Sequence, residues 1–463
     1  MKLREAENIH CIGAGGIGLS AIAKYLAAQG KKVTASDLAP SPISEELADH
    51  GVILSYGQTG GVPIGTDMVV YSEAAPFENP ERADARAKGI PEMSYAEALG
   101  AVSRDKRTIA VSGSNGKSTT TAIIGLILEA AGFDPTVIVG SKVSSFPLGN
   151  LRIGESDWLV VEADDYHAHL LQLRPEIIAL TNIEEEHLDY FTDLEHIVRT
   201  FQSFVDSLPE DGTLVVNADD EVSFDDLNHR PGTITYGIEE QADLMAMDIK
   251  TQTGEQSFTL ALPGEEAKDA GLFTLKIPGK FNVSNALAAI AVARSLGIDD
   301  EIIRTTLAGF NGIWRRFERL GEADGATIIS DYGHHPTAIR ATVEAAREFY
   351  PGRRLVLVYQ PHQRHRTKAL MNDFAAAFDN VDLLILSDIY DVAGREDDGT
   401  SDVTSALLAE TIAARPESPR TILGGDLRHT EDMLRANLQT NDIVVIMGAG
   451  TIDGLARNLT SHS

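Results

Sequence analysis

Residues 113–118 have the types and the order that bind nucleotide phosphates. The loop Gly113-Ser-Asn-Gly-Lys-Ser118 follows a β-branched apolar stretch and leads into a segment with helical apolar spacing. Backbone N–H groups of such a loop, and of the helix after it, bind phosphate oxygens. Lys117 would add a point charge for the β- and γ-phosphates, and the Ser118 hydroxyl could ligate Mg²⁺. Val111 stands where the strict pattern has glycine, so the sequence predicts a variant phosphate loop.

A second glycine loop opens the chain. Gly13, Gly15 and Gly18 fit the pattern G-x-G-x-x-G between a short apolar stretch and a helical segment. Asp37 closes the next apolar stretch, at about the 20-residue spacing at which dinucleotide-binding βαβ units carry an acid for ribose hydroxyls. The alternative is a tight packing turn between strand and helix that binds no ligand.

Two strand-like stretches end in carboxylates. The first is Trp158-Leu-Val-Val-Glu-Ala-Asp-Asp165, and the second, 178–183, is followed by an acidic turn that contains His187. In a parallel sheet we expect both ends at the same edge as Ser118. Glu162 and His187 could then hold a second divalent ion, since Mg²⁺ prefers oxygen ligands. The alternative is a solvated acidic turn in which His187 caps a helix.

Two further pairs of polar residues suggest contacts with the rest of a nucleotide. Asn282 and Asn285 lie one turn apart at an expected helix start. Their amides could contact an adenine edge, or Asn282 could cap the helix. Arg315 and Arg316 stand at an expected domain junction. An arginine there could bind a γ-phosphate when domains close, or form an interdomain salt bridge.

Histidine-rich turns follow two apolar stretches in the last third of the chain. The segments 330–337 and 359–367 each contain two histidines, and the second also contains arginines. Such turns at strand ends suggest a pocket for a carboxylate. The alternative is a zinc site formed by His334, His335, His362 and His365. Neither cysteine nor an HExxH-like spacing accompanies these histidines.

Composition excludes several classes of protein. The 463 residues predict about two to four domains. No apolar run reaches about 18 residues, no signal-peptide core is found, and the only cysteine, Cys11, is expected in the core, so a cytoplasmic protein without membrane contact is predicted. The net charge of −30 disfavours nucleic acid as a partner. Anionic nucleotides would need focused positive charge, for which the candidates are Lys117, Arg315, Arg316, Arg364 and Arg366.

Strand-like and helix-like segments alternate along the whole chain, which predicts an α/β fold with mainly parallel sheets. The clearest strand-like stretches are 9–12, 32–37, 67–71, 109–112, 158–161, 177–180, 354–359, 382–386 and 442–447. We expect three domains, 1–104, 105–317 and 318–463. Within the second, the acidic and glycine-rich stretch 225–271 is expected to be rich in β-structure.

Taken together, these motifs resemble those of the Mur ligase family, in the same order and over nearly the whole chain. The matching segments are Gly13–Gly18, Gly113–Ser118, Gly149–Arg152, Glu162–Asp164, Thr181–Glu184 with His187, Asn282–Asn285, Arg315–Phe317, Asp331–Thr337, Gln360–His362 and Met447–Gly450. Within the family, Asp331–Thr337 and Gln360–His362 are most similar to the members that add alanine.

The resemblance implies a three-domain Mur ligase architecture, with a Rossmann-like UDP-sugar domain, a P-loop ATPase-like central domain and a Rossmann-like amino-acid domain. It reassigns the opening loop to the UDP part of a substrate, bound by Gly13, Gly15, Gly16, Ile17, Gly18, Asp37 and Ser72. It implies that ATP is bound by Gly113, Ser114, Asn115, Gly116, Lys117, Ser118, Thr119, Asn282, Asn285, Arg316 and Asp331. Two Mg²⁺ ions are implied at Ser118, Glu162 and His187, and an amino acid at Tyr332, His334, His362, Arg364 and Arg366.

The activity implied by the resemblance joins L-alanine to the carboxylate of UDP-N-acetylmuramate, with ATP, through an acyl phosphate, in peptidoglycan precursor synthesis. The expected catalytic residues are Lys117, His187, Arg316, Asp331 and His334, with His334 as the base that accepts a proton from the amine. We expect a cytoplasmic monomer or weak homodimer without a nucleic-acid or membrane partner.

Several positions depart from the family pattern and keep alternatives open. They are the Ser-Asn and Ser118 positions of the phosphate loop, Phe281 in place of a histidine, and Gln363-Arg364 in place of Arg-Tyr. Phe201 stands where ligases that add D-glutamate or a diamino acid carry a carbamylated lysine, which favours alanine. The alternatives are a ligase that recycles a tripeptide, a ligase similar to folylpolyglutamate synthase, an NAD-dependent oxidoreductase and a nucleotide-binding regulator without catalysis.

Overall fold

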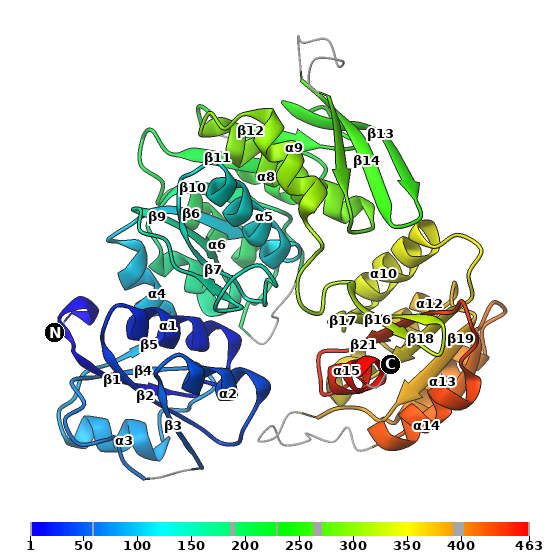
Figure 1. The fold of residues 1–463 in the computed structure, drawn as a ribbon, viewed down its shortest axis with the longest axis horizontal. Coiled ribbons are helices and arrows are strands. Elements are labelled where there is room, and N and C mark those ends of the chain that lie inside the picture. The colour runs from blue at the N-terminus through cyan, green and yellow to red at the C-terminus, as the bar shows by residue number, and fades with distance from the viewer. Residues whose placement is uncertain are drawn as a thin grey trace. The chain divides into compact units, whose positions relative to one another are not determined.

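A computed structural model describes residues 2–57, 60–185, 190–227, 230–262, 271–391 and 402–461. In these residues the strands form three sheets with helices packed against them, which confirms the predicted α/β class (Figure 1). By its internal contacts the chain divides into two compact units. The first comprises residues 1–247, 259–272 and 284–307, and the second comprises 248–258, 273–283 and 308–463.

The first sheet belongs to the N-terminal part of the first unit. Its strand order is β3-β2-β1-β4-β5, and the paired strands run parallel. The elements are η1 (Leu3–Glu5), β1 (Asn8–Ile12), α1 (Ile17–Ala28), β2 (Lys32–Asp37), α2 (Pro42–Asp49), β3 (Ile53–Tyr56), β4 (Met68–Tyr71), α3 (Pro80–Ala87), β5 (Glu92–Ser94) and α4 (Tyr95–Ser103). The chain runs outward from β1 to β3 and then returns to the other side of β1. Open α/β sheets bind ligands beyond the strand ends at such a switch.

The second sheet contains the strand that precedes the phosphate loop. Its order is β15-β14-β13-β12-β11-β10-β6-β9-β7-β8. The elements are β6 (Arg107–Ser112), α5 (Lys117–Ala130), β7 (Thr136–Ile138), β8 (Leu151–Arg152), β9 (Trp158–Glu162), η2 (Tyr166–Gln172), β10 (Pro175–Leu180), α6 (Leu194–Val205), β11 (Thr213–Asn217), α7 (Glu221–Leu227), β12 (Ile234–Gly237), β13 (Leu244–Gln252), β14 (Glu255–Ala261), β15 (Leu272–Leu275), α8 (Lys280–Ser295) and α9 (Asp300–Gly309). Strands β9, β6 and β10 are parallel neighbours, so their carboxyl ends meet at one edge.

The third sheet lies in the second unit. Its order is β16-β17-β21-β18-β19-β20, with an antiparallel edge pair, β16–β17, beside parallel strands. The elements are β16 (Glu318–Ala323), β17 (Ala326–Asp331), α10 (Pro336–Phe349), β18 (Leu355–Tyr359), α11 (Arg364–Ala369), α12 (Met371–Ala377), β19 (Leu383–Ser387), α13 (Ser405–Ala413), β20 (Arg420–Gly425), α14 (Leu427–Asn437), β21 (Ile443–Met447) and α15 (Asp453–Ser461). Buried side chains of β18 and β21 contribute to apolar cores on both faces of this sheet.

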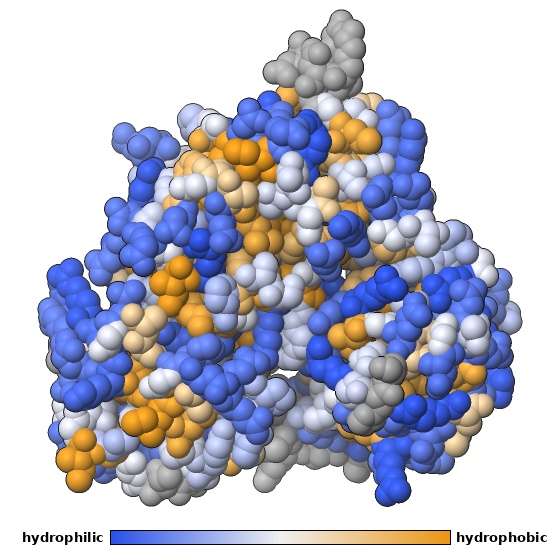
Figure 2. Space-filling model, viewed as in Figure 1, coloured by the Kyte–Doolittle hydropathy of each residue, from blue (hydrophilic) through white to orange (hydrophobic). Residues whose placement is uncertain are grey.

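The predicted strands coincide with strands of the structure within a residue or two at their ends. Cys11 is fully buried, as expected of a core residue. The described part of 225–271 contains β12, β13 and β14, which confirms its predicted β-structure. Among the described residues, no helix has the length and the apolar character to cross a membrane. The face drawn in Figure 2 is mostly hydrophilic with scattered apolar patches, in keeping with the net charge of −30.

Candidate functional site

The phosphate loop joins β6 to α5 in the first unit. Gly116 precedes α5 with a φ of 87°, and Gly113 has a φ of 130°, conformations that other residues rarely adopt. The loop is held against the end of β10. Asn115 N–H donates to Asn182 Oδ1 over 2.9 Å, and the Thr181 hydroxyl donates to the Asn115 carbonyl over 2.5 Å. These contacts fix the loop ahead of the N-terminus of α5, the arrangement that binds phosphate.

Lys117, the first residue of α5, is held by polar groups of its own site. Its Nζ donates to the Gly113 carbonyl over 2.6 Å and to the Ser114 carbonyl over 3.1 Å. It also forms an ion pair with Asp165 at 3.0 Å, and the Asp165 side chain is only 2% exposed. Without Lys117 that buried carboxylate would lose its counter-ion, and a buried charge without a counter-ion destabilises the folded chain.

Glu162, at the end of β9, lies against the next residue of the loop. The Ser118 hydroxyl donates to Glu162 Oε1 over 3.0 Å, and the backbone N–H of Gly140 donates to Oε2 over 2.7 Å. A Cβ at Gly140 would lie 2.8 Å from both carboxylate oxygens, so a larger residue there would push Glu162 or the loop out of its present position. The predicted contact of Glu162 with His187 falls outside the described residues, and the role of His187 stays a prediction.

The opening glycine loop meets two other strand ends of the first sheet. Gly15 N–H donates to Asp37 Oδ2 over 2.6 Å, and Leu38 N–H donates to Oδ1 over 2.7 Å. Gly13 has a φ of 82°, and a Cβ there would lie 2.9 Å from the Cβ of Ser72. The ends of β1, β2 and β4 therefore bring Gly13, Gly15, Asp37 and Ser72 together at the switch point.

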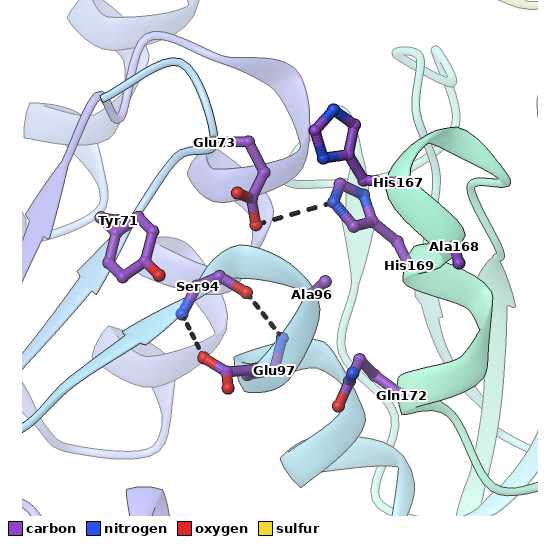
Figure 3. A pocket seen from close by; sticks show the side chains of 9 residues that line it. All are labelled: Tyr71, Glu73, Ser94, Ala96, Glu97, His167, Ala168, His169 and Gln172. Carbon is purple, nitrogen blue, oxygen red and sulfur yellow. Dashed lines mark hydrogen bonds and ion pairs between the residues drawn. The ribbon is translucent and has the colours of Figure 1, made fainter. Parts of the chain in front are cut away.

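A pocket of about 250 Å³ lies in the first unit next to Ser72 (Figure 3). Its lining comprises Tyr71, Glu73, Ser94, Ala96, Glu97, His167, Ala168, His169 and Gln172. In Figure 3 the acidic side chains come from the β4 and α4 side of the pocket, and the histidines come from η2. The lining is thus mostly polar and includes both carboxylates and imidazoles.

The η2 wall of this pocket has a strained backbone. His167 and Ala168 are consecutive residues with φ values of 51° and 56°. Such conformations cost of order 1–3 kcal/mol each and persist where packing holds them. The His167 ring stacks on Tyr190 with centroids 4.5 Å apart, and His169 Nε2 lies 3.6 Å from Glu73 Oε1. His169 Nδ1 lies 3.3 Å from Asp164 Oδ2, which links the pocket to the acidic end of β9.

Helix α8 begins at Lys280, two residues before Asn282. The capping alternative for Asn282 is therefore wrong, because this residue lies inside the first turn and its Nδ2 donates to the Pro278 carbonyl over 2.7 Å. Asn285 lies beside the phosphate loop of its own unit, since a Cβ added at Gly116 would collide with Asn285 Oδ1.

In the second unit, Asp331 ends β17 and is 7% exposed. Its Oδ2 accepts a hydrogen bond from Phe317 N–H over 2.8 Å, and its Oδ1 accepts one from Gly333 N–H over 2.7 Å. Burial raises the pKa of Asp331, although Arg316 and the two N–H donors act in the opposite direction. The carboxylate thus anchors the segment that carries Arg316 to the end of β17.

Arg315 and Arg316 have different environments. Arg315 is 8% exposed, burial lowers its pKa, and its guanidinium donates to the Gly448 carbonyl of the same unit. Arg316 is exposed, and its guanidinium carbon lies 5.3 Å from the ring centroid of Tyr332. Arg315 and Phe317 have φ values of 57° and 49°, so Arg316 stands between two left-handed residues.

His334, His362, Arg366 and Tyr359 gather near the ends of β17 and β18. The rings of His334 and His362 have centroids 6.0 Å apart. Burial and, after it, the charge of Arg366 lower the pKa of His334 to about 3. Among the described residues, Arg366 Nη1 and Tyr359 Oη are buried without a hydrogen-bond partner. These two atoms could bind a carboxylate, as the carboxylate-pocket interpretation requires.

Other residues named for this pocket have partners within the chain. Arg364 Nε pairs with Asp391 at 2.8 Å, and its Nη1 donates to the Val403 carbonyl. His335 caps α10, and His365 is exposed. Within the described ranges, no group of three or more His, Cys, Asp or Glu side chains is arranged to hold a metal ion, the four histidines of the zinc alternative included.

Several residues of these sites carried no role in the sequence interpretation. Asp165 was visible only as one acid of a run, Gly140 belongs to no motif, and Tyr359 reads as a core residue of β18. Tyr390 stacks on His362 with centroids 5.6 Å apart, although the two are distant in sequence. A buried hydroxyl at the end of an apolar strand is the one signal that could have singled out Tyr359.

Three family models match consecutive parts of the chain. They are described as "Mur ligase family, catalytic domain" over residues 8–107, "Mur ligase middle domain" over 111–293 and "Mur ligase, glutamate ligase domain" over 315–450. The chain is 41% identical to the UDP-N-acetylmuramate–L-alanine ligase of Desulfotalea psychrophila, over 97% of this chain and 96% of the relative. It is 40% identical to the same-named ligase of Alkaliphilus metalliredigens, over 100% and 99%. The chain belongs to the Mur ligase family, as its motifs predict.

Solved structures agree with the three-domain Mur ligase architecture. The UDP-N-acetylmuramate-alanine ligase of Thermotoga maritima is similar over 98% of both chains, with a TM-score of 0.86 and 25% identity. A murein peptide ligase of Psychrobacter arcticus is similar over 98% of both chains, with a TM-score of 0.71 and 23% identity, a likeness of fold alone.

Proposed function

We propose that this chain is an ATP-dependent ligase that joins L-alanine to the carboxylate of UDP-N-acetylmuramate, in peptidoglycan precursor synthesis. The observation that carries the proposal is the contact of Ser118 with Glu162 beside the Lys117 ammonium, at the start of the phosphate-loop helix. Similarity to ligases of that name over nearly the whole chain supports the choice of substrates.

Mg²⁺ would be held by Ser118 and Glu162, whose hydroxyl and carboxylate are the oxygen donors this ion prefers. A second ion is expected at Glu162 with His187. Bound Mg²⁺ offsets negative charge on the phosphates of ATP. Among the chain's own groups, Lys117 would contact the β- and γ-phosphates, Asn285 the adenine, and Arg316 the γ-phosphate.

The reaction we propose has two steps. The substrate carboxylate attacks the γ-phosphorus of ATP, which yields an acyl phosphate and ADP. The amine of the amino acid then attacks the acyl carbon, and phosphate leaves as the amide forms. Lys117 and Arg316 would stabilise charge on the transferring phosphoryl group. Closure of domains would exclude water from the acyl phosphate.

The second step requires a group that accepts a proton from the amine, and His334 is our candidate. Its imidazole is neutral near pH 7, because burial and the charge of Arg366 hold its pKa at about 3. A carboxylate bound to Arg366 would offset part of that charge and make His334 a stronger base. Arg366 and Tyr359, with their unmet buried donors, would bind the carboxylate of the amino acid.

The opening loop would bind the UDP group, with Gly13–Gly18 at its phosphates and Asp37 or Ser72 at its ribose or sugar. We further propose three domains, 1–104, 105–317 and 318–463. The three family models match the chain in the same order, which supports this division. We also propose that the protein is cytoplasmic and is a monomer or a weak homodimer.

The test is release of phosphate from ATP in the presence of UDP-N-acetylmuramate, with and without L-alanine, glycine, L-serine or the tripeptide of the recycling reaction. Release that requires both the UDP-sugar and L-alanine is expected. Release with another amine would keep the ligase and change its acceptor. No release with any of these amines would contradict the proposed reaction.

A further inference from the structure

The segment Gly149–Arg152 is a family motif to which the proposed function assigns no role. In the structure it closes a loop, residues 139–150, that joins β7 to β8. Asn150 in this loop is 0% exposed, and Lys24, which lies against it from α1, is 2% exposed. Burying an amide and an ammonium is costly unless both are hydrogen-bonded, so their partners define where the loop must lie.

Asn150 ties the loop to the first turn of α1. Its Nδ2 donates to the Ile17 carbonyl over 2.6 Å and to the Ser20 hydroxyl over 2.9 Å. Its Oδ1 accepts a hydrogen bond from Lys24 Nζ over 2.9 Å, and the same Nζ donates to the Leu148 carbonyl over 2.9 Å. Because Ile17 belongs to the opening glycine loop, the amide of Asn150 bonds directly to the element assigned to the UDP group.

The beginning of the same loop contacts the candidate metal carboxylate. Val139 N–H donates to the Asn150 carbonyl over 3.1 Å. The next N–H, that of Gly140, donates to Glu162 Oε2 over 2.7 Å, and Glu162 Oε1 accepts from Ser118 over 3.0 Å. One peptide unit therefore separates the hydrogen bond that positions residue 139 from the hydrogen bond that orients Glu162.

We propose that loop 139–150 couples the opening glycine loop to the metal–nucleotide site, with Asn150 and Lys24 as positioning residues. A donor substrate that fixes Ile17 would fix Asn150, and through Val139 and Gly140 it would hold Glu162 toward Ser118. Metal–nucleotide would then bind more tightly, and by linkage it would tighten binding of the donor by the same factor. The ligands named here rest on the proposed function.

The experiment measures this coupling in the full chain. The probe is the Mg²⁺ complex of a non-hydrolysable ATP analogue, titrated by calorimetry without and with saturating UDP-N-acetylmuramate. In the wild type we expect the donor to tighten binding of the probe at least about fivefold. In Asn150→Ala we expect binding without the donor to stay within about twofold of wild type, and the tightening by the donor to be lost. A variant that merely loosened the fold would weaken both measurements alike.

Arg152→Ala is the matched control, because Arg152 belongs to the same motif but bonds to Asp134 and the Pro135 carbonyl rather than to α1. It should keep the tightening. If circular dichroism shows that Asn150→Ala does not fold, Lys24→Met removes the second tie and is expected to lose the tightening.

Three results would overturn the proposal. Tightening that persists in the folded Asn150 or Lys24 variant would show that the coupling takes another route. A wild type that binds both ligands without tightening would show that the sites are independent, while the proposed function would stand. A wild type that does not bind UDP-N-acetylmuramate at all would instead overturn the proposed function, and the coupling with it.

Discussion

The two polar sites differ in how their side chains are satisfied in the folded chain. In the first unit, Lys117 and Glu162 are bonded to neighbouring groups of their own site, the first to Asp165 and the second to Ser118. In the second unit, Arg366 and Tyr359 each bury a polar atom that has no hydrogen-bond partner among the described residues.

Because of this difference, substitutions in the two sites should affect the stability of the fold and the affinity for ligands in different ways. A buried donor without a partner costs about 1–3 kcal/mol, which a ligand can return when it supplies the missing acceptor. A ligand of the first site must instead replace bonds that already exist. Substitutions in the first site should therefore lower both catalysis and stability, whereas substitutions in the second should change ligand binding and leave stability nearly unchanged.

The largest expected effect is that of Lys117→Ala. Turnover should fall at least about 10³-fold, because the variant lacks the ammonium that stabilises negative charge on the transferring phosphoryl group. The free energy of unfolding should fall by about 3 kcal/mol, since Asp165 remains buried without its counter-ion. Phosphate release and urea unfolding measure the two effects, and binding of the UDP-sugar should survive. Lys106→Ala is the control, because Lys106 lies before β6, at the opposite end of the strand, and its Nζ donates to the Ser156 carbonyl. Near-wild-type turnover of Lys117→Ala would contradict the site assignment.

Arg366→Met tests the other half of the comparison. We expect the KM for the amino acid to rise about 10- to 100-fold, because a charged hydrogen bond to its carboxylate is lost. Urea unfolding should show little change. Tyr359→Phe, a smaller change in the same pocket, should raise that KM about threefold and leave the free energy of unfolding unchanged or higher. A large loss of stability in either variant with an unchanged KM would mean that these groups serve the core instead of a ligand.

Gly140→Ala sharpens the comparison within the first site. The added Cβ would lie 2.8 Å from both oxygens of Glu162, so the carboxylate or the loop must shift. Displacing a group that orients a metal ligand should raise the Mg²⁺ concentration for half-maximal turnover about tenfold. Gly309→Ala is the matched control, since no atom lies within 4 Å of a Cβ built there. Equal Mg²⁺ titrations for the two variants would remove Glu162 from the metal site.

The last expected effect concerns pH. The pKa of His334 is about 3 in the folded chain against its usual 6.5. Between these values the unfolded chain binds the additional proton, so this residue lowers stability as the pH falls from about 6.5 toward 3. His334→Gln should therefore reduce the loss of unfolding free energy between pH 7 and pH 4, measured by urea titration, while exposed His365→Gln should not. Parallel pH dependences for His334→Gln and wild type would show that the histidine titrates normally.

The sequence was sufficient for the features that depend on local order. Apolar periodicity predicts the alternation of strands and helices, and a parallel sheet places Glu162 and Ser118 at one edge, where the structure shows their hydrogen bond. For Asn282 the polar pattern left two alternatives open, an adenine contact and a helix cap, and the cap is wrong because α8 already begins at Lys280. The role of His187 stays a prediction, since it lies outside the described residues.

Contacts between distant segments could not be predicted in this way. That Lys117 pairs with Asp165 rather than with another acid of the run depends on how η2 leaves β9. That Arg366 and Tyr359 keep buried polar atoms without partners among the described residues depends on the course of the chain between β18 and α11. The approach of Gly140 to Glu162 depends on a loop of irregular structure, and the spacing of apolar residues does not predict the path of such a loop.

Arg316 stands between two residues, 315 and 317, whose backbones occupy the left-handed region. A glycine at either position would relieve about 1–3 kcal/mol of conformational energy, and it would also let the backbone at Arg316 turn. The folded chain thus keeps residues 315 and 317 in conformations of unfavourable energy. The exposed guanidinium of Arg316 lies over the ring of Tyr332. The backbone therefore fixes the direction of the Arg316 Cα–Cβ bond before any ligand binds, whereas the outer torsions of the side chain remain free to rotate. When an anion binds, the conformational entropy that is lost comes mainly from these outer torsions.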